Sequence, residues 1–164
     1  MKSVIITGAT RGIGLALARF YADKGYCLML NGGHNEEALD AVEKELSTKT
    51  QVITCLGSVA EEKTAAAIVQ KTLDTFGQID LLINNAGIAH IGLLSDMSSE
   101  EWHTLMGTNL DAVLYVKSCD SSYGTPSQWK NPKCLFCLGR SRCFLRSCLF
   151  CLKRCRQFSY KGSG

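Results

Sequence analysis

Three glycines, Gly8, Gly12 and Gly14, follow the apolar residues 4–6 and have the spacing of a phosphate-binding turn. Glycine allows the backbone to turn tightly and to come close to a ligand. A helical pattern begins at Gly12 and would point its first N–H groups, with the positive end of the helix dipole, at an anion. Three glycines alone also suit an ordinary loop. The order of strand, turn and helix favours a site for the pyrophosphate of a dinucleotide.

A second polar segment, Asn84-Asn85-Ala86-Gly87, ends another apolar run. Asparagine is common in simple turns, so the segment by itself predicts only a turn. Its position in the chain is more informative, because two strand–helix units separate this segment from the first glycine turn. In a doubly wound parallel sheet, strands related in this way meet where ligands bind. We therefore expect both polar segments to reach one crevice.

Residues 1–117 alternate between short apolar runs and helical periods. Strands are expected at residues 3–7, 26–31, 51–56 and 79–84. Helices are expected at residues 12–24, 35–47 and 61–76, with a cap at Asn35 and terminal glycines at Gly25 and Gly77. This alternation predicts an α/β fold, a Rossmann-type doubly wound parallel sheet with right-handed crossovers.

A further helix is expected to open with a capping box. Ser98 and Glu101 have the required spacing, since a Ser at the cap is followed three residues later by Glu. The helical period then places Trp102, Leu105 and Met106 on the inward face.

The two polar segments together closely resemble those of the short-chain dehydrogenase/reductase family. That family has Thr-Gly-x-x-x-Gly-x-Gly in its first turn and Asn-Asn-Ala-Gly after its fourth strand. The resemblance covers about residues 3–116 and is closest to the bacterial 3-oxoacyl-(acyl-carrier-protein) reductases of fatty acid biosynthesis. It implies a strand order of 3-2-1-4-5-6-7 and an NAD(P)H-dependent reduction of a carbonyl. The substrate would be a small molecule or a 3-oxoacyl group on its carrier.

The resemblance also assigns residues to the cofactor. Those that bind or shape its diphosphate end are Thr7, Gly8, Thr10, Arg11, Gly12, Ile13 and Gly14. Those that stabilise the second turn and pass the adenosine ribose are Asn84, Asn85, Ala86 and Gly87.

The end of the second strand favours NADP(H) over NAD(H). An acid there would bind the ribose hydroxyls and repel a 2′-phosphate, but the chain has Asn31 and then no acid until Glu36. Arg11 could pair with the 2′-phosphate, or could simply be a solvated turn residue. Ser58 stands where the family usually has an Asp facing the adenine amino group, and a hydroxyl accepts a weaker hydrogen bond than a carboxylate.

The catalytic residues implied by the family are mostly absent. Asn109 matches the Asn that supports a water relay, although a polar residue inside a helix would look the same. No Tyr-x-x-x-Lys pattern occurs, and Tyr115 and Lys117 have the wrong spacing. The family's Ser is missing too. We therefore predict that the chain lacks its general acid.

Composition changes abruptly after residue 117. Residues 1–117 hold 9 Lys and Arg against 14 Asp and Glu, a net charge of −5. Residues 118–164 hold 9 against 1, a net charge of +8, together with seven of the nine cysteines. Single domains rarely change so sharply. We therefore divide the chain into a dinucleotide-binding half, 1–117, and a tail, 118–164.

The cysteines of the tail allow several interpretations. Cys134 with Cys137, and Cys148 with Cys151, have the C-x-x-C spacing of zinc knuckles. Loose spacing and interleaved apolar residues argue against a metal site, and a cytoplasmic setting disfavours disulfides. The positive charge would suit nucleic acid, but no recognisable binding fold accompanies it. We expect neither metal ligands nor a nucleic-acid partner.

Out-of-frame translation explains the tail better. Residues 146–161, written back into codons and read from the second base, can give E-V-A-Y-S-A-S-K-G-A-V-N-S-V-T-K, which contains the missing Tyr-x-x-x-Lys. The same shift turns residues 133–138 into N-V-S-S-V-W, the strand that carries the family's Ser. It turns residues 118–123 into A-V-I-P-A-M, a continuation of the preceding helix. Three matches in the correct order predict a frameshift near residues 116–118, so the chain is frameshifted or truncated relative to the family.

This interpretation predicts an inactive reductase, with a non-catalytic nucleotide-binding or zinc-binding remnant as the alternative. The later strands are expected to be missing, with the outer edge of the fourth strand unpaired and the tail without a stable fold. Two helices form the oligomer contact in the family. One is the helix that is interrupted after Val116 in this chain, and the other follows the catalytic Tyr that this chain lacks. The homo-oligomer of the intact family is therefore in doubt for this chain.

Bulk composition suits a single soluble domain. The chain has 164 residues, of which 46% are hydrophobic and 20% charged. No apolar run is long enough to cross a bilayer, and Lys2 alone does not make a signal peptide. We expect a cytoplasmic location and no membrane partner.

Overall fold

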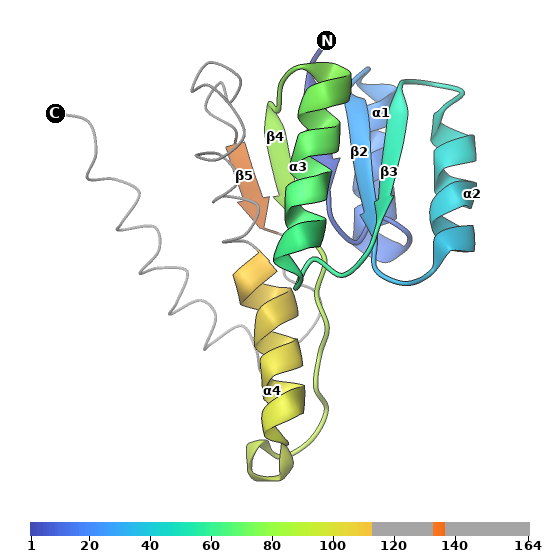
Figure 1. The fold of residues 1–164 in the computed structure, drawn as a ribbon. Helices are drawn as coiled ribbons and strands as arrows, with labels where there is room; N and C mark the ends of the chain where they lie inside the picture. The colour runs from blue at the N-terminus through green and yellow to red at the C-terminus, as the bar shows by residue number, and fades with distance from the viewer. Residues whose placement is uncertain (113–132, 137–164) are drawn as a thin grey trace, which may run out of the picture.

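Figure 1 shows the computed structural model, which describes residues 1–112 and a strand at residues 133–136. All strands belong to one parallel sheet with the order β3-β2-β1-β4-β5. Their bounds are Ser3–Ile6 for β1, Cys27–Gly32 for β2, Val52–Leu56 for β3, Leu81–Asn84 for β4 and Lys133–Phe136 for β5. The order of the first four strands confirms the predicted Rossmann-type sheet.

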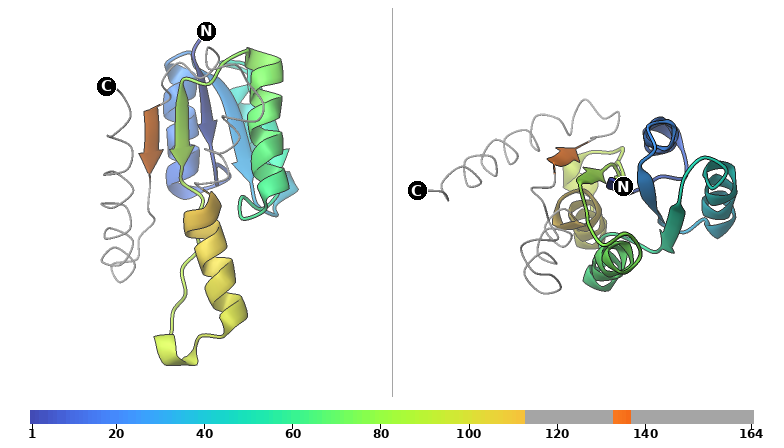
Figure 2. Two further views of the ribbon diagram at one scale, coloured as in Figure 1. Left: turned by 60° about the vertical axis from the view of Figure 1, so that its left-hand side comes forward. Right: turned by 90° about the horizontal axis from the view of Figure 1, so that it is seen from above.

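Helices cover both faces of this sheet (Figure 2). Their bounds are Gly12–Asp23 for α1, Glu36–Leu46 for α2, Glu62–Phe76 for α3 and Ser99–Met106 for α4. A 3₁₀ turn, η1, spans Leu94–Asp96, and a π-helical turn, η2, spans Gly107–Asp111 directly after α4. Within the described residues, no helix is long and apolar enough to span a bilayer.

Alternate strand residues divide the core into two layers. Val4 and Leu28 pack in the cluster that contains α1 and α2, whereas Ile5 and Met29 pack in the cluster that contains α3. All four side chains are fully buried. Because both faces of a parallel sheet are covered, its central strands are continuous apolar runs, and that is why these strands were recognisable in the sequence.

The helix ends follow the capping chemistry expected from the sequence. The Asn35 side chain accepts from the N–H of Ala38 at 2.8 Å and caps α2. Gly77 ends α3 with φ of 75°, in the left-handed region that favours glycine. Ser98 and Glu101 form the predicted capping box of α4, with bonds of 3.2 and 2.8 Å.

Trp102 departs from the prediction that it points inward. Its side chain is 44% exposed, whereas Leu105 on the same helix is buried. Figure 1 shows the reason, since α4 extends away from the sheet and its first turn lies beyond the core. Of the two residues, the one nearer the sheet, Leu105, is the one that is buried.

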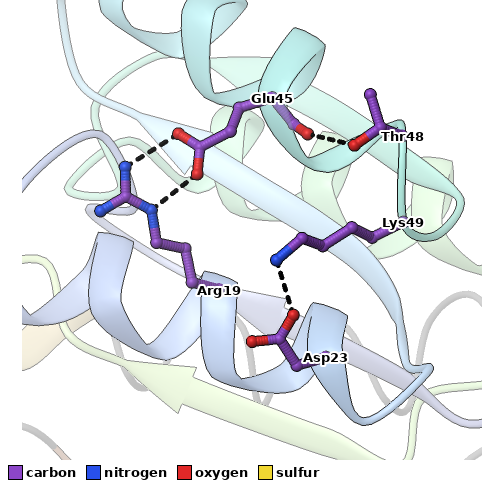
Figure 3. Close-up of polar contacts among 5 residues, drawn as sticks. All are labelled: Arg19, Asp23, Glu45, Thr48 and Lys49. Atoms are coloured by element: carbon purple, nitrogen blue, oxygen red, sulfur yellow. Dashed lines mark hydrogen bonds and ion pairs between the residues drawn. The ribbon is translucent and has the colours of Figure 1, made fainter.

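Two surface ion pairs join α1 to α2 and to the turn that follows α2 (Figure 3). Arg19 donates to both carboxylate oxygens of Glu45 at 2.7 and 2.8 Å, and Lys49 contacts Asp23 at 2.7 Å. The hydrogen bond from Arg19 lowers the pKa of Glu45. All four side chains are exposed, so these pairs orient the two helices and contribute little to stability.

The outer edge of β4 is paired, which corrects the expectation that it would be bare. β5 runs parallel to β4, with Leu81 opposite Lys133 and Asn84 opposite Phe136. A parallel ladder uses only backbone N–H and C=O groups, so a strand can form without the side chains that the family has there. The remaining parts of the tail, including the other six cysteines that follow residue 118, lie outside the described residues.

Candidate cofactor site

The glycine turn after β1 packs directly against the turn after β4. Gly8 has φ of +64°, and a Cβ built there would lie 2.9 Å from the Cα of Ala86. A Cβ on Gly14 would overlap the carbonyl oxygen of Gly8 and lie 2.5 Å from Nδ2 of Asn85. Gly8 and Gly14 are therefore required for packing inside the protein, in addition to any approach of a ligand.

Thr7 and Asn85 connect the two turns. The Thr7 hydroxyl oxygen accepts from the N–H groups of Asn85 and Ala86, both at 3.0 Å. The Asn85 side chain donates through Nδ2 to the carbonyl oxygens of Thr7 and Gly8, also at 3.0 Å. Because Thr7 is only 2% exposed, its hydroxyl shapes the site from inside the protein.

The start of α1 is open to an anion. Arg11 is the N-cap residue, is exposed, and makes no side-chain capping bond. The first turn of α1 contains no acidic residue, so the positive end of the helix dipole is not neutralised there. Gly12 has φ of +57°, and Ile13 exposes 53% of its surface beside it. A phosphate at this end would meet the first N–H groups of the helix.

Thr10 borders the end of β2. A Cβ on Gly32 would lie 2.9 Å from Cγ2 of Thr10 and 3.3 Å from Cδ2 of Leu39. A side chain at position 32 would therefore displace Thr10. The end of this strand has no carboxylate, and the packing leaves little room for one.

Asn31 is buried beneath the same edge and is 1% exposed. Its Nδ2 donates to the carbonyl oxygens of Cys55 and Gly57, both at 3.0 Å. Burial raises the pKa of the neighbouring Cys55 thiol, which keeps this group neutral at ordinary pH. The side-chain amide of Asn31 is thus used within the protein.

Ser58 lies just after β3 and is half-buried. Its hydroxyl oxygen accepts from the N–H of Ala60 at 3.3 Å, which closes a local turn. This local bond accounts for a Ser at this position without a ligand, while leaving the hydroxyl able to donate.

Asn109 meets the second polar segment from η2. Its Oδ1 accepts from the N–H of Ile88, and its Nδ2 donates to the Ile88 carbonyl oxygen, both at 2.9 Å. A Cβ on Gly87 would lie 3.0 Å from the same Oδ1. Asn109 lies in a π-helical turn, a local geometry that occurs frequently at functional sites.

The structure therefore brings most of the predicted residues to one edge of the sheet. Asn84 lies at the end of β4, directly before Asn85, and is 8% exposed. Tyr115 and Lys117 lie outside the described residues. Two contributors were not predicted, Ala9 and Ile88, and both act through backbone atoms. Their side-chain types carry no signal of that role.

A family model for short chain dehydrogenases matches residues 2–119. The chain belongs to the short-chain dehydrogenase/reductase family. One curated relative, the 3-oxoacyl-(acyl-carrier-protein) reductase FabG of Chlamydia muridarum, is 40% identical over 119 residues. That match covers 71% of this chain and 48% of the relative. The chain thus spans about half the length of the curated relatives that it matches.

Solved structures share the fold. An alcohol dehydrogenase from the archaeon Thermococcus sibiricus, complexed with 5-hydroxy-NADP, matches with a TM-score of 0.69 and 31% identity. The match covers 74% of this chain and 52% of that one. An L-sorbose reductase from Gluconobacter frateurii, complexed with NADPH and L-sorbose, matches with a TM-score of 0.68 and 27% identity. That match covers 71% of this chain and 45% of the reductase.

Proposed function

We propose that residues 1–117 are the cofactor-binding half of an NADP(H)-dependent reductase. The observation that carries the proposal is the glycine turn after β1, which Asn85 holds in place beside an uncapped start of α1. Such a turn places the pyrophosphate over the N–H groups of the helix. The residues around this edge that we assign to cofactor binding are Thr7, Gly8, Thr10, Arg11, Gly12, Ile13, Gly14, Asn31, Ser58, Asn84, Asn85, Ala86 and Gly87.

The end of β2 supports a preference for NADP(H). A Cβ on Gly32 would crowd the Thr10 side chain, which leaves little room there for the acid that would bind a free ribose. Arg11 is exposed at the start of α1 and can pair with a 2′-phosphate. The two similar structures described above were solved with NADPH or an NADP derivative, which agrees with this preference.

The names of the relatives support a 3-oxoacyl thioester, or a similar carbonyl compound, as the substrate of the intact enzyme. Hydride would come from the nicotinamide, while the protein orients the two reactants and supplies the proton. Asn109, held by Ile88, is the one catalytic position of the family that this chain retains. Without the Ser and the Tyr-x-x-x-Lys, we expect the chain to bind the cofactor but not to reduce a carbonyl.

The division into residues 1–117 and an out-of-frame tail is part of the same proposal. Two features of the sequence support it: the composition changes abruptly after residue 117, and residues 133–138 give the family's Ser-bearing strand when read in the shifted frame. Sequencing the gene around codons 114–120 tests this directly. If independent isolates carry the same reading frame as this chain, with no inserted or deleted base near these codons, the frameshift is contradicted.

Cofactor binding is tested by titrating the 164-residue chain with NADPH and with NADH. We expect tighter binding of NADPH, and loss of binding in Gly14→Val, because a side chain at Gly14 would push the helix away from Gly8. Ala16→Val is the matched control, since Ala16 lies exposed on the same helix. Unchanged NADPH binding in Gly14→Val would refute the site.

A further inference from the structure

Asn31 occupies the point where three connections of the fold come together. Its side-chain amide donates to Cys55 and Gly57 at the end of β3, and to the carbonyl oxygen of Gly32 at 3.3 Å. Its own carbonyl oxygen accepts from the N–H of Ala9, in the turn after β1, at 2.9 Å. One residue therefore contacts the turns that follow β1 and β3 and the last residue of β2.

The connections that follow β2 and β3 diverge at this point. The bonds of Asn31 therefore hold the ends of the two strands together. The ladder between β2 and β3 ends at the pair Gly32 and Leu56. Beyond it, β2 leads to α2 on one face of the sheet, while β3 leads to α3 on the other face (Figure 2). Only one further backbone bond, from the Gly57 N–H to the Gly32 carbonyl at 2.8 Å, supplements the Asn31 amide there.

We propose that Asn31 is a positioning residue for the adenosine half of the dinucleotide, through its amide bonds to the ends of β2 and β3. This inference rests on the proposed function, because the ribose of a bound dinucleotide lies at the end of the second strand. Among the residues assigned to cofactor binding, Asn31 would act indirectly, because its side-chain amide donates to carbonyl oxygens of the protein. It holds the two chain segments between which the adenosine would lie.

The chemistry of the contact requires an amide. Nδ2 of Asn31 faces only carbonyl oxygens, so the position needs a donor with two hydrogens. An Asp has the same shape, but its ionised carboxylate only accepts and would be repelled by those oxygens. Asn31→Asp would therefore not create an NAD-type acid, because the new carboxylate would point into the protein. A Ser would restore one donor.

The test compares two ligands that occupy different ends of the site. Inorganic pyrophosphate probes the glycine turn, and 2′,5′-ADP probes the adenosine end, each titrated into the full chain. For Asn31→Asp we expect the Kd of 2′,5′-ADP to rise about tenfold or more, with the Kd of pyrophosphate changed by less than about twofold. Asn31→Ser should give an intermediate loss, because it keeps one donor.

Asn35→Asp is the matched control. It introduces the same charge on the same connection, but Asn35 accepts from Ala38, and an Asp fills that capping role equally well. We expect a change of about twofold or less in the Kd of 2′,5′-ADP, since an exposed charge is screened. Hydrogen exchange of the Gly57 N–H should be faster in Asn31→Ser than in the native chain.

The outcomes separate this inference from the proposed function. If the native chain binds neither ligand, the proposed function fails and this inference fails with it. If the native chain binds both, and Asn31→Ser leaves both constants and the Gly57 exchange unchanged, only this inference is overturned. Equal weakening of both ligands would also overturn it, since that pattern indicates a general structural role. If Asn31→Asp does not fold, the two Kd values and the Gly57 exchange measured in Asn31→Ser decide the test.

Discussion

Thr7 and Asn85 hold each other across the boundary between β1 and β4. Nδ2 of Asn85 donates to the Thr7 carbonyl oxygen at 3.0 Å, while the Thr7 hydroxyl accepts from the N–H of Asn85 at 3.0 Å. Both bonds are made between groups of the protein, so the protein itself holds the two turns together. Holding a binding site in place in this way reduces the conformational entropy lost on binding.

Removing the Thr7 hydroxyl should destabilise the fold. Thr7→Val keeps the shape but leaves the N–H groups of Asn85 and Ala86 without their acceptor. We expect a loss of about 1–3 kcal/mol in the free energy of unfolding, measured by denaturant titration. Thr48→Val is the control, because the Thr48 hydroxyl is exposed and makes only a local bond to Glu45 (Figure 3). Equal stability of the two variants would contradict this interpretation.

A side chain at Gly8 should be costly for two reasons. Its φ of +64° lies in the left-handed region, and a Cβ would press against the backbone of Ala86. Gly8→Ala is expected to lower the free energy of unfolding by about 1–3 kcal/mol. Gly33→Ala should cost far less, because a Cβ there has nothing within 4 Å. Thermal melting of both variants compares the two positions, and a Gly8→Ala variant as stable as Gly33→Ala would refute the argument.

Arg11 should determine the preference between the two nicotinamide cofactors. Arg11→Ala is expected to raise the Kd of NADPH about tenfold and to leave that of NADH within about twofold, because only NADPH carries the 2′-phosphate. Arg19→Ala provides the control on the same helix, where the guanidinium binds Glu45. If Arg11→Ala weakens both cofactors equally, Arg11 does not contact the 2′-phosphate.

The capping box of α4 should respond to acid. The hydrogen bond from the Ser98 N–H lowers the pKa of Glu101 below its value in the unfolded chain, which is about 4.3. The stabilisation is therefore fully present above that unfolded pKa and is lost as pH falls through the lower, folded pKa. The protection factor of the Ser98 N–H against hydrogen exchange, which corrects for the intrinsic exchange rate at each pH, should fall in that acid range. Glu101→Gln, which keeps a capping box without titrating, should not show this change. Identical pH profiles of Ser98 N–H protection in the native chain and in Glu101→Gln would contradict this prediction.

Carbonyl reduction should be absent from this chain. With NADPH and an acetoacetyl thioester, we expect no oxidation of the cofactor, because no Tyr-x-x-x-Lys supplies the proton. A chain carrying the shifted frame after residue 117 should be a soluble, active oligomer. Turnover by the 164-residue chain within about 1–1000 per second would contradict the prediction.

The sheet was predictable because its strands are buried on both faces. Residues 3–7 and 26–31 were recognisable as apolar runs, and the observed β1 and β2 differ by one residue at their ends. The capping residues Asn35 and Ser98 were predictable too, since each signal is local in the sequence.

Other features depend on how distant segments meet. The exposure of Trp102 follows from the direction of α4, and the pairing of β5 follows from the free backbone edge of β4. The inward orientation of the Asn31 amide depends on the ends of β3. None of these relationships has a periodic pattern in the sequence, so the residues alone could not predict them.

Hydrogen exchange of the backbone amides, with and without NADPH, tests the central claim most directly. Binding at the proposed site should slow exchange in the first turn of α1, at residues 12–15, and in the turn after β2. The effect of NADPH should exceed that of NADH at equal concentration. Protection by NADPH that leaves residues 12–15 unchanged, or no protection at a saturating concentration, would contradict the account.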